Sequence, residues 1–228
     1  KLNAYDQRYY RRWMHELPPM RHRDRKSVID VHHTILPESS RLRPDPRKLL
    51  DAARKLPNDD LFVLCPHDMV LHSAVHLFQD GDFAGGLRDL IDQDQMLRHF
   101  GQHEPGFWPG LVPRAAELTL QRPLWYALRF ARRLLGTPVP DDVIEASRVG
   151  RPPAPIVALM DQLVTRALPP PMTGSPRSPR PAALPRLAAG AARWLLYVRS
   201  HWLRMPPALL AQHLTRKALR RVADEDSP

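Results

Sequence analysis

Four polar side chains in one stretch of the chain have the types and spacing of a binding site. His72 and His76 stand four residues apart on a predicted helix, so both imidazoles lie on one face. Asp89 and Asp92 stand three apart on the next predicted helix and share a face in the same way, with Arg88 beside them. The short segment DGDFAGG joins the two helices and favours an antiparallel pair. The sequence therefore predicts that these side chains meet, with at least one histidine within hydrogen-bonding reach of an aspartate.

This group has three interpretations. In the first it is structural, with partly buried imidazoles hydrogen-bonded to the two aspartates. In the second, the group contacts a ligand or substrate. In the third, the histidine pair joins His67 and Asp68 in the metal site of a hydrolase, although the zinc-protease pattern HExxH fails because no Glu follows His72.

Asp30 is a second residue whose position points to chemistry. The segment SVIDVHHTIL alternates over residues 27–35 and is rich in β-branched residues, which predicts a strand paired with the preceding segment in a hairpin. A carboxylate buried there without a partner would cost several kcal/mol. Either Asp30 faces solvent on an open sheet, or it faces a site that supplies arginine, lysine or a divalent metal.

The elements that must position these residues follow from composition. The 228 residues are 43% hydrophobic, and 26 prolines against 10 glycines favour short helices with rigid breaks. We predict a predominantly helical α+β protein with a hairpin in residues 1–45, a helical bundle in 46–168, a proline-rich linker in 169–185 and a basic helical tail in 186–228. Expected helices span 45–55, 66–79, 87–100, 108–120, 123–135, 140–147, 155–168, 187–203 and 207–222.

The sequence gives weaker indications of the cellular compartment and of the binding partners. A single cysteine, Cys65, and the lack of a secretory signal favour the cytoplasm, and no apolar run is long enough to span a membrane. The net charge of +10 lies mostly in residues 172–228 and favours an anionic partner such as nucleic acid or a membrane surface. The aromatic and basic pattern around Trp194 and Arg199 fits either such binding or a helix docked on the bundle with its arginine stems packed along it.

Three motifs in order give the chain a family resemblance: VIDVHH, PHDMVLHSAVH and LRDLIDQDQML. Over residues 5–100 the chain resembles the uncharacterised nucleotidyltransferase family of bacteria, within the DNA polymerase β-like superfamily. The resemblance implies transfer of a nucleotidyl group from a nucleoside triphosphate to an acceptor hydroxyl, with Mg²⁺ as cofactor and pyrophosphate as leaving group.

The resemblance also implies roles for the residues singled out above. In the superfamily a Gly-Ser turn and an Asp-x-Asp strand supply two metal-binding carboxylates, and a later strand supplies a third, which Asp30 matches. The first two are absent, so the chain resembles the C-terminal portion of a longer enzyme, and its first residue, Lys1, agrees with that expectation. A helical wall facing nucleotide or acceptor would comprise His72, His76, Arg88, Asp89 and Asp92. The alternative function is a non-catalytic helical module that binds an anionic partner through its basic tail.

Overall fold

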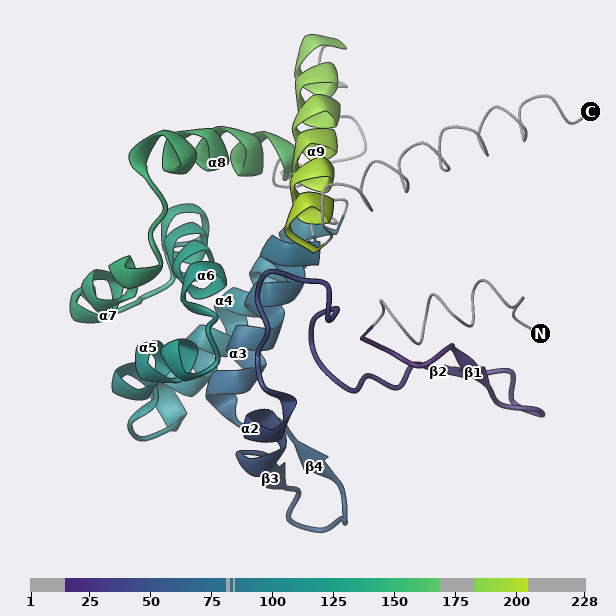
Figure 1. Cartoon of the computed structure of the whole chain (residues 1–228). Helices are drawn as coiled ribbons and strands as arrows, with labels where there is room; N and C mark the ends of the chain where they lie inside the picture. The colour runs from purple at the N-terminus through teal and green to yellow at the C-terminus, as the bar shows by residue number, and fades with distance from the viewer. Residues whose placement is uncertain (1–14, 81–82, 84, 169–182, 205–228) are drawn as a thin grey trace, which may run out of the picture.

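The computed structural model describes residues 15–80, 83, 85–168 and 183–204, and these form two small strand pairs and a set of packed helices (Figure 1). The predicted class, predominantly helical α+β, is confirmed. None of the described helices is both long and apolar enough to cross a membrane. The elements in chain order are β1 (Met20–Arg21), β2 (Val28–Ile29), α2 (Pro46–Asp51), β3 (Arg54–Lys55), β4 (Phe62–Val63), α3 (Pro66–Val75), the π-helical turn η1 (His76–Asp80), α4 (Gly86–His103), α5 (Phe107–Glu117), α6 (Gln121–Leu135), α7 (Asp141–Ala146), the 3-10 turn η2 (Ser147–Gly150), α8 (Ala154–Ala167) and α9 (Ala183–Arg204).

Proline and glycine set several helix ends. Pro66 occupies the first turn of α3, where its missing N–H would have had no helical partner in any case. Gly136 ends α6 in the left-handed conformation, with φ of 64°. The described helices fall where the hydrophobic periodicity of residues 66–168 predicts them.

The core centres on α6 and the end of α3. Every residue from Pro123 to Leu128 is buried, and the ring of Phe78 stacks on Tyr126 and Phe130 at centroid distances of 5.5 and 5.7 Å. Helices α4, α5 and α6 all pack against α3. Burial of large aromatic side chains gives this region much of its stability, so α3 is a rigid base for the residues along it.

The predicted N-terminal hairpin is present but shorter than expected. Only Val28–Ile29 of the predicted strand 27–35 pairs regularly, with Arg21 opposite Val28, and an isolated bridge joins Glu16 to His32. Val28 and Ile29 are 52% and 57% exposed. A two-stranded ribbon without a covering layer is marginal, and this explains why regular pairing ends after two residues.

A second strand pair corrects the prediction of helix over residues 45–55. Helix α2 ends at Asp51, and Arg54–Lys55 pairs with Phe62–Val63. The loop between them contains Pro57 and Asn58, and the Leu56 amide donates to the Leu61 carbonyl at 2.9 Å. Turn-forming residues so close to the helix end reverse the chain.

The basic helix α9 is docked on the bundle. Arg199 Nη1 donates to the Phe78 carbonyl at 2.7 Å, and Arg193 Nε donates to the Ala167 carbonyl at 2.8 Å. These cations meet carbonyls at the ends of other helices, which is where the helix dipole favours them. For α9 the structure thus shows the docked alternative. Of the predicted linker 169–185, residues 169–182 lie outside the described residues, as does the predicted helix 207–222. Helix α9 begins at Ala183, so the last three residues of that linker are helical, while the remaining domain division stays a prediction.

Candidate functional site

Helices α3 and α4, with η1 between them, form a pocket of about 420 Å³ that we call the histidine–aspartate pocket. It brings together four of the five helix residues singled out from the sequence. Its lining is Leu64, Met69, His72, Ser73, His76, Asp89, Asp92 and Met96. The two histidines and the two aspartates therefore line one pocket, as predicted, while the hydrogen bond between a histidine and an aspartate and the chemical roles assigned to these residues stay predictions.

The facing of the two helices is fixed by a buried amide. Gln93 is fully buried on α4, and its Nε2 donates to the Val70 carbonyl of α3 at 3.3 Å. This contact turns the face that carries Asp89 and Asp92 towards α3. Arg88 is 85% exposed and lies at the edge, 3.9 Å from Asp92.

The histidine side of the pocket lies where α3 changes to a π-helical turn. His72 is half-buried, His76 is exposed and begins η1, and their ring centroids are 5.5 Å apart. A π-helical turn adds one residue to the helical repeat and so changes the direction of the side chains that follow, and such turns are frequent at functional sites.

The hairpin reaches the same place. Burial, with smaller effects from His76 and His32, lowers the pKa of His72 below its ordinary value. Burial, followed by the neighbouring His32, Arg204, His76 and His33, lowers the pKa of His15 to about 4. The imidazoles of His15 and His72 are thus neutral at pH 7, and the histidines of the hairpin lie near those of α3.

Within the hairpin, His15, Glu16 and His32 could hold a metal ion. One ligand atom from each lies within 4.8 Å of the others, and Glu16 Oε2 is 3.3 Å from His32 Nε2. Two imidazoles and a carboxylate are a donor set for zinc-like ions, whereas Mg²⁺ prefers oxygen ligands. Sequence spacing alone does not single out His15 and Glu16, since the signal for them is the cross-strand pairing of Glu16 with His32, which is seen only in the folded chain.

Asp30 follows β2 directly and is exposed, as in the solvent-facing alternative. Among the described residues, the group of three or more side chains that could share a metal ion does not include Asp30. The described residues therefore do not fit a complete magnesium site.

The contacts of His67 and Asp68 contradict the hydrolase interpretation. Asp68 is fully buried, and Arg114 donates to its two oxygens from Nε at 2.8 Å and from Nη2 at 2.7 Å. His67 stacks on Phe107 at 5.1 Å, with its Nε2 2.9 Å from the Phe107 carbonyl oxygen. These contacts hold both side chains against α5, away from the histidine–aspartate pocket.

Comparison with known proteins identifies a family for this chain. A family model described as an uncharacterised nucleotidyltransferase matches residues 1–136. This segment contains the hairpin and the whole histidine–aspartate pocket, and it ends at the glycine that caps α6. No curated protein and no solved structure matches the chain.

Proposed function

Because the chain belongs to the uncharacterised nucleotidyltransferase family, we propose that it takes part in transfer of a nucleotidyl group from a nucleoside triphosphate to an acceptor hydroxyl. The acceptor oxygen forms a bond to the α-phosphorus, the bond from that phosphorus to the bridging oxygen breaks, and pyrophosphate leaves. The hydroxyl proton passes to a nearby base. The observation that carries the proposal is the family match over the segment that contains the pocket.

The histidine–aspartate pocket supports a role in holding hydroxyl groups. Its carboxylates, Asp89 and Asp92, accept hydrogen bonds and repel a triphosphate, while the neutral imidazole of His72 offers one acceptor and one donor nitrogen. A ribose or an acceptor carries the hydroxyl donors that such a lining prefers. We assign the pocket to the sugar or to the acceptor, and not to the phosphates.

Asp30 is proposed as one carboxylate of the metal site. Its exposure on the hairpin leaves it accessible for coordination, and the remaining carboxylates are proposed to come from outside the described residues. Bound Mg²⁺ would supply charge neutralisation at the phosphates. The chain's own contribution is to present the Asp30 carboxylate on the exposed side of the hairpin.

The test compares Asp30→Asn with Asp24→Asn in the full natural chain, measured as Mg²⁺-dependent pyrophosphate release from each of the four nucleoside triphosphates. Asp24 lies in the turn of the same hairpin and is also exposed, so it is a matched control. Loss of a metal-binding carboxylate should lower release by about a hundredfold or more, while Asp24→Asn should stay within about twofold.

A thermal melt of both variants checks that folding is unchanged. Equal turnover of the two variants would remove Asp30 from the metal site. Absence of pyrophosphate release from the wild type with all four triphosphates, over a panel of hydroxyl acceptors, would overturn the proposed reaction.

A further inference from the structure

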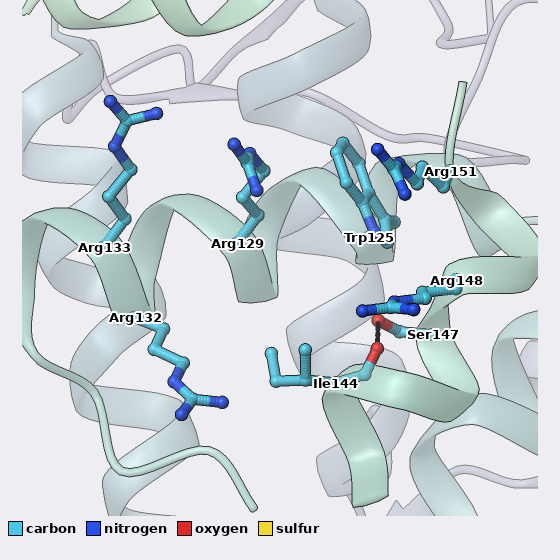
Figure 2. A pocket seen from close by; sticks show the side chains of 8 residues that line it. All are labelled: Trp125, Arg129, Arg132, Arg133, Ile144, Ser147, Arg148 and Arg151. Carbon is cyan, nitrogen blue, oxygen red and sulfur yellow. Dashed lines mark hydrogen bonds between the residues drawn. The ribbon is translucent and has the colours of Figure 1, made fainter. Parts of the chain in front are cut away.

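A second pocket, of about 570 Å³, lies between α6 and the segment formed by α7 and η2 (Figure 2). We call it the arginine pocket. It is lined by Trp125, Arg129, Arg132, Arg133, Ile144, Ser147, Arg148 and Arg151. The last four of these residues follow the segment matched by the family model, so family membership assigns nothing to the pocket as a whole.

The guanidinium groups of the pocket outnumber the carboxylates that pair with them. Asp161 pairs with Arg129 at 2.6 Å and with Arg133 at 2.8 Å. Two further ion pairs join Arg132 to Asp141 at 2.7 Å and Arg148 to Glu145 at 3.0 Å. No carboxylate of a described residue pairs with Arg151. The pocket thus has five arginines and three carboxylates that pair with them, which leaves an excess of positive charge at its surface.

The ion pairs differ in how easily a ligand can replace them. Asp161 is only 17% exposed, and its hydrogen bonds from Arg129, with the charge of Arg133, hold its pKa below the ordinary value. It therefore fixes these two guanidinium groups in place. Asp141 and Glu145 are 87% and 65% exposed, and such pairs contribute little in water. An incoming anion can take over their arginines at small cost.

The walls of the pocket hold the arginines in distinct positions. Figure 2 shows Arg129 and Arg133 projecting from one side of α6 beside Trp125, while Arg132 and Arg148 extend towards Ile144 from opposite sides. The Arg129 guanidinium lies 5.4 Å from the Trp125 ring centre. The two walls are close because Gly150 packs against the Gln121 carbonyl with no room for a Cβ. The spacing of the arginines is therefore set by rigid elements.

We propose that the arginine pocket binds the phosphate groups of a ligand that carries at least two of them, a chemistry shared by nucleoside polyphosphates and polynucleotide backbones. Guanidinium groups bind phosphate oxygens in pairs with good geometry. Several guanidinium groups held apart in one pocket fit a ligand with several linked phosphates better than they fit a single phosphate. Trp125 is buried, so the proposal involves no base stacking. Phosphate binding at this pocket is a separate property from nucleotidyl transfer, because it requires no chemical reaction.

The test pairs two double variants with the same change in net charge. Arg148→Gln with Arg151→Gln removes two guanidinium groups from the pocket, while Arg47→Gln with Arg166→Gln removes two exposed ones elsewhere. The probes are inorganic tripolyphosphate by calorimetry and a fluorescent single-stranded oligonucleotide of about 12 nucleotides by anisotropy. Matched thermal melts show that both variants fold.

We expect the pocket variant to bind at least one probe about tenfold more weakly, with a shallower dependence on salt concentration, and the control to stay within about twofold. Loss of tripolyphosphate binding assigns the pocket to a small polyphosphate, and loss for the oligonucleotide alone assigns it to a polynucleotide. Equal effects of the two variants, or equally tight binding of a polyglutamate of the same charge, would overturn the proposal. None of these measurements depends on nucleotidyl transfer.

Discussion

Helix α3 carries two polar residues, Asp68 and His72, that lie one turn apart and have opposite environments. Asp68 is fully buried and both of its oxygens are bound by Arg114. His72 is half-buried and lines an open pocket beside two carboxylates. A fully satisfied buried pair holds helices together and has nothing left to offer a ligand. A group at an open pocket contributes less to packing and keeps its capacity to bind.

The strongest way to break this contrast is Asp68→Ala. The substitution leaves the Arg114 guanidinium, 14% exposed, without its buried partner. Breaking a buried pair costs about 3–5 kcal/mol, and we expect a loss of unfolding free energy of that size in urea denaturation. Asp92→Ala is the matched control because Asp92 is 54% exposed, and it should change stability by less than about 1 kcal/mol. Equal losses would show that the two environments do not differ in energy.

The second substitution, His72→Ala, tests the residue that lines the open pocket. If the pocket holds a hydroxyl-bearing group, loss of one hydrogen bond should lower the transfer rate at limiting substrate about tenfold. Unfolding free energy should fall by only about 1 kcal/mol. His103→Ala serves as control, because His103 is exposed at the end of α4. A stability loss as large as that of Asp68→Ala, with no effect on rate, would make His72 a structural residue.

A change of pH should have a smaller effect on the free energy of unfolding. Burial lowers the pKa of His72 in the folded protein, so on acidification the unfolded chain takes up the proton first. The contribution of neutral His72 to the free energy of unfolding is fully present above pH 6.5, the ordinary pKa of histidine. It is lost as pH falls towards the lowered pKa of His72 in the folded protein. Urea midpoints between pH 7.5 and 5 should therefore decline more steeply for the wild type than for His72→Gln. Parallel declines in the two proteins would contradict the assigned environment.

The smallest effect is expected at an exposed pair. Arg54 Nη1 lies 2.9 Å from Glu104 Oε2, but the two side chains are 52% and 30% exposed. Arg54→Ala should change unfolding free energy by less than about 1 kcal/mol. A loss near that of Asp68→Ala would mean that distance, and not burial, decides the strength of ion pairs in this protein.

The sequence predicts the helices and the meeting of His72 and His76 with Asp89 and Asp92, because helical spacing and a short turn are local properties. It does not predict the extent of the hairpin, since pairing depends on whether another layer covers Val28 and Ile29. The arginine pocket escapes prediction for a related reason. The net charge of the bundle is close to neutral, and only the folded chain shows that its acids and arginines are unevenly distributed.

One missing methyl group gives the arginine pocket a geometric property separate from its charge. At Gly150 the backbone of η2 contacts that of α6, and any side chain there would clash with the Gln121 carbonyl and push the two walls of the pocket apart. Gly150→Ala changes no charge, yet it would widen the distances between guanidinium groups on opposite sides. The charge of the pocket and the spacing of its guanidinium groups are therefore set by different residues: the arginines set the charge, and the backbone contact at Gly150 sets the spacing.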